Sequence, residues 1–337
     1  MVRADSKILS AGGVILLLPF LIYSYNVQGV SLAYNLTNNI NQYNMSSGGH
    51  VAGLRPYIFL EDVVTFNYEG DFSLINLAPE NLLIANSAAI GKDILLPGVG
   101  NRTALYARYY SFYAPSYDLY GVTDVALGDS LRLYAGNYLL KPDVRVRYKY
   151  YHSELVTDYL EPRAKISVRI PLPYAYFTPE VSGGFRSYGE ELTPFYTTSA
   201  WLLLPLSLNL SFSTIFTFHR AVAPDSLFIV PSEYIDDPFF EEENVEETYD
   251  LEFGLNKSLI RERAFIEGRV KLFRKKYYEV SGMGRRDEGI NIALQYTRFV
   301  DSKFVFHVKA STLMNASTVN DFDFMKNDLE LIFELIF

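Results

Sequence analysis

The sequence predicts an all-β protein that folds as a transmembrane, antiparallel, up-and-down β-barrel of about sixteen strands. Three observations predict this class. Segments of alternating apolar and polar residues recur along the chain, the connections between them are either short or long, and the final residues form one more alternating segment that ends on an aromatic residue. Because strand side chains alternate faces with a period of two, each segment has one apolar and one polar face.

Composition narrows the class further. The 337 residues are 49% hydrophobic and 15% aromatic, with a single long apolar run near the N-terminus, whereas a helical membrane protein would contain several. The absence of cysteine excludes disulfides, thiolate metal sites and a lipid-attachment cysteine. A formal net charge of −9 argues against nucleic acid as a partner, because phosphate binding needs a basic surface.

The first residues have the order of a secretory signal peptide. Arg3 and Lys7 precede an uncharged stretch, and the small residue Gly29 follows a polar segment. The alternative is a signal anchor that remains as a membrane helix, but the run is short for a span of about 20 residues and contains Pro19. We therefore expect two parts, a signal peptide at 1–29 and a transmembrane β-barrel at 30–337.

The alternating segments are justified one after another by their period of two. In chain order they are 30–36, 52–60, 63–76, 103–113, 117–126, 131–140, 144–152, 163–171, 174–188, 195–204, 209–220, 248–258, 263–279, 289–299, 303–314 and 327–337. The region before Lys141 alternates least clearly, so counts from about twelve to eighteen strands stay open.

The connectors from Lys141 onward alternate between tight and long. The tight ones are 141–143, 171–174, 205–208, 260–263 and 300–303, and the long ones across the chain are 37–51, 78–101, 153–161, 221–247, 280–288 and 315–326. Such sorting places short turns at one rim of an up-and-down barrel and long loops at the other, whereas a soluble Greek-key sandwich has no reason for it.

The polar faces are predicted to line an enclosed aqueous lumen, because a large membrane barrel is apolar outside and polar inside. The alternative is a soluble sandwich with ordinary solvated faces. The predicted lumen-lining residues are Arg145, Arg147, Lys149, Lys165, Arg169, Asp250, Glu252, Glu267, Arg269, Lys271, Lys303, His307, Lys309, Glu330 and Glu334. The first five form a positive wall, which either sets a transverse field for solutes or pairs with carboxylates and plugs the barrel.

The C-terminus carries the one family resemblance. Leu329, Leu331, Phe333, Leu335 and the terminal Phe337 lie on one face of the last segment. This pattern resembles the C-terminal signal of bacterial outer-membrane β-barrel proteins and is porin-like. The resemblance implies export to the bacterial outer membrane, contact with the lipid bilayer, and recognition of this strand by the barrel-assembly machinery. It leaves a homo-oligomer open and identifies no subfamily.

The sequence indicates no enzyme. The histidines His50, His152, His219 and His307 have no metal-ligand spacing, and no nucleophile, base and orienting group are grouped in the sequence. No catalytic or cofactor-binding residue is therefore assigned.

One acidic segment is a candidate for Ca²⁺, because clustered carboxylates suit hard cations. Its residues are Asp236, Asp237, Glu241, Glu242, Glu243, Glu246 and Glu247, in the longest predicted external loop. The alternative is a solvated acidic loop without a metal, and no other cofactor is expected.

Three functions follow from these expectations. The first is a passive channel for small hydrophilic solutes, because about eight strands fill a barrel with side chains whereas about sixteen leave an aqueous passage. The second is a structural or surface-interaction barrel with a closed or plugged lumen. The third and most distant is an outer-membrane hydrolase.

Overall fold

The protein folds into one closed antiparallel barrel of sixteen strands, in which each strand pairs with its neighbours in the sequence. The computed structural model describes residues 26–37, 49–61, 64–76, 82–98, 100–113, 121–152, 158–222, 245–259, 263–278, 284–319 and 322–337. Among these residues, no helix is long and apolar enough to cross a membrane. The predicted fold class is confirmed.

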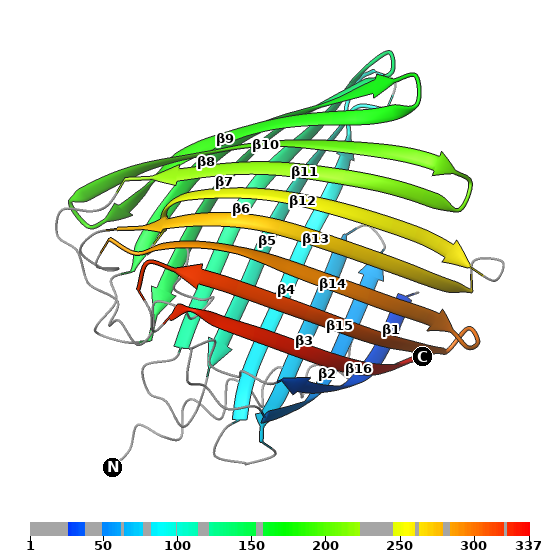
Figure 1. The fold of residues 1–337 in the computed structure, drawn as a ribbon. Helices are drawn as coiled ribbons and strands as arrows, with labels where there is room; N and C mark the ends of the chain where they lie inside the picture. The colour runs from blue at the N-terminus through cyan, green and yellow to red at the C-terminus, as the bar shows by residue number, and fades with distance from the viewer. Residues whose placement is uncertain are drawn as a thin grey trace, which may run out of the picture.

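The strands are 11–17 residues long and run up and down around the ring (Figure 1). Their bounds are β1 Asn26–Thr37, β2 Gly49–Glu61, β3 Thr65–Ile75, β4 Leu82–Leu95, β5 Arg102–Tyr113, β6 Gly121–Ala135, β7 Tyr138–Tyr151, β8 Tyr159–Leu172, β9 Ala175–Tyr188, β10 Glu191–Ser207, β11 Leu210–Ala221, β12 Val245–Leu259, β13 Ala264–Tyr277, β14 Arg286–Phe299, β15 Phe304–Ser317 and β16 Phe324–Ile336.

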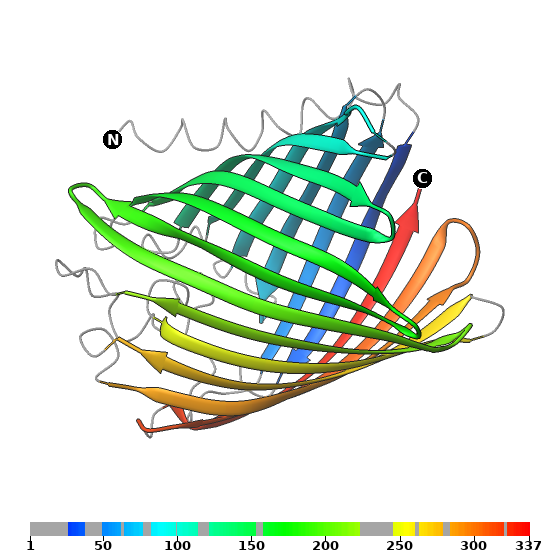
Figure 2. The same cartoon turned by 90° about the horizontal axis from the view of Figure 1, so that it is seen from above.

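The ring closes where β1 pairs with β16, in a register that runs from Gly29 opposite Ile336 to Thr37 opposite Asp328. Seen from above, β16 lies directly beside β1 (Figure 2). Closure gives each of the sixteen described strands two hydrogen-bonded neighbours, so none of these strands has an unpaired edge.

Two strand predictions before Lys141 were wrong, and the two errors cancel in the count. β4 lies within the predicted loop 78–101, because its small residues Ala85, Ala88 and Ala89 weaken the apolar alternation. β6 was predicted as two segments, 117–126 and 131–140, although it runs unbroken to Ala135.

The turns near β7 and after β9 also differ from the prediction. The predicted turn at 141–143 lies inside β7, and the chain reverses instead at Gly136, whose φ of 62° suits glycine. β9 and β10 are joined by a two-residue turn at Gly189, with φ 72°, at the rim where long loops were expected. The alternation of short and long connectors therefore has this exception.

The predicted cleavage point after Gly29 falls inside β1. Residues 26–29 pair with β2, and the Phe337 backbone N–H donates to the Gln28 carbonyl at 2.8 Å. Cleavage after Gly29 remains a prediction, and N-terminal sequencing of the protein isolated from membranes checks it: a first residue of Val30 agrees, and any other start contradicts it.

Candidate functional site

The inner face of the barrel is identified by side chains that bond across an intervening strand. Tyr57 on β2 donates to Glu334 on β16 at 2.5 Å, and Tyr106 on β5 donates to Asp143 on β7 at 3.1 Å. Neighbouring strands lie about 4.8 Å apart. Side chains that are two strands apart can therefore touch only on the concave inner face of the barrel, where their ends converge.

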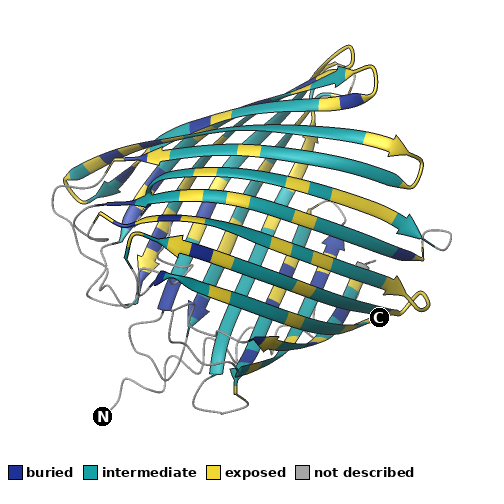
Figure 3. Cartoon of the chain, viewed as in Figure 1, coloured by how far each residue is buried: buried dark blue, intermediate teal, exposed yellow. Residues whose placement is uncertain are grey.

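In each of these two contacts the tyrosine passes over a glycine on the intervening strand, where a larger residue would block it. A Cβ at Gly29 would lie 2.4 Å from the Tyr57 hydroxyl, and one at Gly128 would lie 2.4 Å from the Tyr106 ring. The opposite face of most strands carries exposed apolar side chains, for example Val146, 47% exposed, and Phe333, 45% exposed. Exposed positions recur along the strands between less exposed ones (Figure 3). The charged alternate positions therefore face inward.

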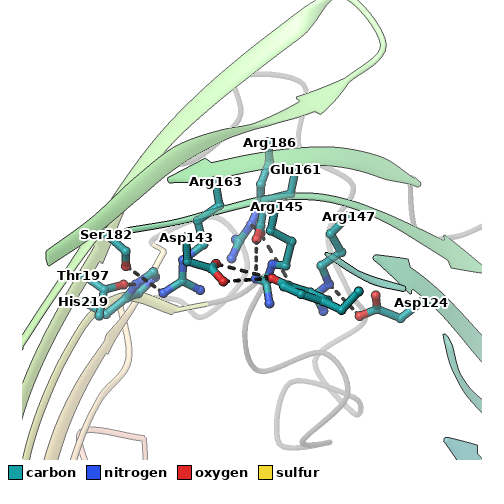
Figure 4. A network of polar contacts seen from close by, with 11 residues as sticks. Asp124, Asp143, Arg145, Arg147, Glu161, Arg163, Ser182, Arg186, Thr197 and His219 are labelled. Atoms are coloured by element: carbon teal, nitrogen blue, oxygen red, sulfur yellow. Dashed lines mark hydrogen bonds and ion pairs between the residues drawn. The ribbon is translucent and has the colours of Figure 1, made fainter. Parts of the chain in front are cut away.

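A dense ionic network covers the inner face of β6 to β9 (Figure 4). At its centre is Glu161, whose carboxylate lies 3.2 Å from Arg145, 3.2 Å from Arg186 and 3.8 Å from Arg147. The Glu161 side chain is only 1% exposed. Removing a carboxylate from water is costly unless it is paired and hydrogen-bonded, and these arginines supply both.

Glu161 also resolves a repulsion that the register imposes. Arg145 on β7 stands directly opposite Arg163 on β8, and like charges opposite one another destabilise a strand pair. Arg145 turns toward Glu161, while Arg163 donates to the Ser182 hydroxyl at 2.7 Å. Further along β7, Arg147 donates to Asp124 at 2.6 Å.

Aromatic rings hold several of these cations in place. Arg147 and Arg186 lie 5.9 Å and 5.4 Å from the ring centroid of Tyr159, and Arg186 also lies 5.3 Å from that of Phe195. The Lys149 ammonium lies 5.1 Å from the ring centroid of Tyr151. These cation–π contacts add to the ion pairs and help to fix the positions of the basic side chains.

We call the inward basic residues of β7 to β9 the basic wall: Lys141, Arg145, Arg147, Lys149, Arg163, Lys165, Arg169 and Arg186. Five of them were predicted, and Lys165 pairs with Glu180 at 3.4 Å. Arg163 and Glu161 were missed as lining residues, although they share the alternating frame of Lys165. Arg186 was missed because no sequence pattern links β9 to Glu161.

A second lining region lies on β12 to β15. Lys271 pairs with Asp250 at 2.9 Å, and Arg269 lies 3.9 Å from Glu252 and contacts Glu267. These five residues are all among those predicted to line the lumen, and the structure brings them together.

The predicted residues near the C-terminus meet partners that the sequence did not suggest. Lys309 is in register with Glu330, but Glu330 pairs with Arg55 at 3.0 Å, and Arg55 also binds Asp71 at 2.9 Å. Lys303 lies in the exposed turn between β14 and β15.

His307 bridges two strands, with Nδ1 2.9 Å from the Thr297 hydroxyl and Nε2 3.3 Å from Glu334.

We call Asp71, Glu330 and Glu334 the acidic seam, since they lie on either side of the junction between β1 and β16 that closes the ring. β16 stands halfway round the sixteen-strand ring from β8, so the acidic seam lies across the interior from the basic wall.

The remaining histidines make polar contacts of the same kind. His152 lies 3.0 Å from Thr123, His219 lies 2.9 Å from Thr197, and His50 lies 2.8 Å from the Tyr34 hydroxyl. Each contact joins a histidine to a neighbouring strand. In the described part of the chain, no three His, Cys, Asp or Glu residues are placed to hold a metal ion.

Only the end of the predicted acidic segment lies within the described residues. Glu246 pairs with Lys276 at 2.6 Å, and Glu247 lies 3.5 Å from Arg220. The residues outside the described part are Asp236, Asp237, Glu241, Glu242 and Glu243. Because Glu246 and Glu247 form ion pairs with basic side chains, a Ca²⁺ site would depend on the carboxylates of the other five residues.

Calcium binding by the acidic segment therefore remains a prediction. If the five carboxylates bind Ca²⁺, titration calorimetry on the protein in detergent should give heat that saturates in the millimolar range or below. Replacing Asp236, Asp237, Glu241, Glu242 and Glu243 with amides should abolish that heat. A wild-type titration without heat up to millimolar Ca²⁺ would dismiss the site.

The predicted assembly signal lies on the outer face of β16. Leu329, Phe333, Leu335 and Phe337 are all exposed there, and β16 pairs with β15 on one side and β1 on the other. Leu331 follows the same alternation, directly opposite Val308.

Comparison with solved structures agrees with this geometry. The chain is similar to the OpdK crystal structure with vanillate from Pseudomonas aeruginosa, at a TM-score of 0.55 and 10% identity over 93% of this chain and 99% of that one. It is similar to P. aeruginosa OprD at a TM-score of 0.50 and 9% identity, over 93% and 94% of the two chains.

A bacterial polysaccharide outer-membrane secretin also matches, at a TM-score of 0.51 and 11% identity, over 92% of this chain and 98% of that one. No protein-family model and no curated protein sequence matches the chain. At these identities the likeness establishes a shared fold, that of outer-membrane β-barrels, along nearly the whole chain.

Proposed function

We propose that this chain is a passive channel for small hydrophilic solutes in the bacterial outer membrane. One observation carries the proposal: a closed barrel of sixteen strands presents apolar side chains outward and charged side chains inward. A barrel of this strand number encloses more space than its side chains fill, and a charged lining keeps that space wet.

The arrangement of the lining supports a channel with a transverse field. The basic wall and the acidic seam stand half a ring apart, so a solute between them meets opposite charges on two sides. Such a field orients dipolar and charged solutes during passage. The shared fold with outer-membrane proteins such as OprD supports the location.

A structural barrel with a plugged lumen is the second candidate, and one observation favours it. Inward-facing apolar residues gather at the rim of the barrel opposite the start of β1 and the end of β16, where Phe112, Val122, Tyr151 and Tyr159 are 1–7% exposed. Together with the ion pairs of Glu161, they rigidify the barrel and narrow its interior.

A hydrolase is the least supported function. Thr297, His307 and Glu334 form a row with the atoms of a nucleophile, a base and an acid. Thr297 also accepts a hydrogen bond from Gln295 at 3.2 Å. All three residues lie within paired strands, whose backbone N–H groups are used in the sheet and are not free to stabilise an oxyanion. We therefore propose no enzymatic activity.

Two proposed partners follow from β16 and its apolar outer face. Its exposed leucine and phenylalanine side chains suit hydrocarbon, so the lipid bilayer is the proposed environment of the outer face. The same strand is the proposed contact for the barrel-assembly machinery. Association of several copies remains an additional proposal.

Liposome swelling tests the channel proposal. Liposomes that contain the purified protein should swell in isotonic solutions of monosaccharides, more slowly with disaccharides, and at the background rate with large oligosaccharides. Protein-free liposomes are the control. Swelling that stays at the control rate for every solute, including the smallest, would reject the channel and favour the plugged barrel.

A further inference from the structure

We propose that a hollow on the inner wall of β12 to β15 is a binding site for a hydroxylated monoanion, a small solute with one carboxylate and several hydroxyl groups. This inference rests on the proposed channel, since the solute must enter the lumen. The hollow has a volume of about 290 Å³, at the lower end of the range for ligand sites, which suits a monosaccharide-sized solute.

Small residues create the hollow. Ala293 on β14 stands directly between Arg269 on β13 and Ser311 on β15, so two short side chains lie next to each other at mid-height of the wall. Longer side chains, Lys271 and Lys309 among them, surround this floor. The result is a recess in a wall that is otherwise covered by long polar residues.

The charges around the recess leave one cation without a counter-ion. Lys271 is bound to Asp250 at 2.9 Å, and Arg269 is held by Glu252 and Glu267. Lys309 has no ion pair or hydrogen bond with any residue in the described part of the chain. Its register neighbour Glu330 is bound to Arg55 instead. The unpaired ammonium group of Lys309 can therefore bind one anionic group on the solute.

Two neutral groups of the recess also lack partners among the described residues. The Asn291 Oδ1 atom is buried without a hydrogen bond, and the Ser311 hydroxyl makes none within the described residues. A buried acceptor without a donor is costly, by about 1–3 kcal/mol. Hydroxyl groups of a solute can donate to both atoms, as ordered water would. This feature distinguishes a hydroxylated anion from a simple one.

Single-channel recording in planar bilayers tests the proposal, with gluconate as the probe. Added gluconate should reduce the open-channel current of the wild-type protein in a saturable manner. Lys309→Met should weaken the apparent affinity by about tenfold, the scale of one charge-assisted contact. Ala293→Leu, which fills the floor and changes no charge, should weaken it at least as much.

Matched controls separate the recess from the lumen as a whole. Lys326→Met removes the same charge from β16, where Lys326 pairs with Asp328 at 3.5 Å, and should change the gluconate affinity by less than about twofold. Uncharged sorbitol should bind about tenfold more weakly than gluconate because it lacks the carboxylate, and acetate should bind more weakly because it lacks the hydroxyls.

The outcomes distinguish this inference from the proposed function. A conducting wild-type channel whose current is insensitive to gluconate overturns the binding site and leaves the channel intact. Equal gluconate affinity in the wild type, Lys309→Met and Ala293→Leu also overturns it, and acetate that binds as well as gluconate overturns the hydroxyl contacts. A protein that carries no current at all overturns the channel itself.

Discussion

Replacement of Glu161 with glutamine is expected to lower the free energy of unfolding by about 3 kcal/mol, because it breaks a buried ion network by removing one partner. Glu161 is fully buried and is shared by three guanidinium groups, those of Arg145, Arg147 and Arg186. Glutamine keeps the shape but leaves an excess of positive charge on an already basic wall. The barrel should still assemble, since the strand pairing is untouched.

Unfolding in urea, followed by the fluorescence of the single tryptophan, Trp201 on β10, measures this loss. The matched control is Glu180→Gln on the neighbouring strand, since Glu180 is partly exposed and forms an ion pair only with Lys165 among the described residues. That pair is worth about 1 kcal/mol or less. Equal losses in the two variants would show that Glu161 has no special position in the network.

Neutralising Arg145, Arg147 and Lys149 together, each to glutamine, is expected to shift the ion selectivity of the channel toward cations by about threefold or more. These residues are consecutive inward positions of β7 and lie along one line of the basic wall. Removing three positive charges from a narrow lumen lowers the local concentration of anions and raises that of cations. The reversal potential across a salt gradient in planar bilayers measures the shift.

The control for this variant carries charge changes on the outer face. Arg274 pairs with Glu288 at 3.1 Å and Lys276 pairs with Glu246, both on the face of β13 opposite to the lumen. The double variant Arg274→Gln and Lys276→Gln should leave the selectivity unchanged. If the β7 variant conducts with wild-type selectivity, the basic wall does not line the path of ions.

The sequence predicts the strands best where apolar and polar residues alternate without interruption. β14 and β15, with bounds Arg286–Phe299 and Phe304–Ser317, lie within a few residues of the predicted segments. β4 was missed because its alanine, glycine and serine residues are small and differ little in polarity, so the sequence does not distinguish an apolar from a polar face of this strand. β6 was divided because polar residues near Asp129 resemble a turn, although the sheet continues through them.

The candidate site was predicted only in part, for a related reason. Local alternation indicates that Arg145, Lys165 and Lys271 occupy inward faces, but it contains no information on which side chains meet. Glu161 was assigned to a loop because its strand begins earlier than the pattern suggests, at Tyr159. Its partner Arg186 lies on another strand, 25 residues away, and only the register of β8 against β9 brings them together.

The sequence by itself determined the two faces of each strand, because a period of two follows from the geometry of the extended backbone and needs no partner. Closure of the ring decided the rest. It brings Arg55 to Glu330 across 275 residues and leaves Lys309, beside the recess, without a counter-ion among the described residues. Such contacts depend on the register of sixteen strands around one circuit, which is a property of the whole barrel and not of any segment.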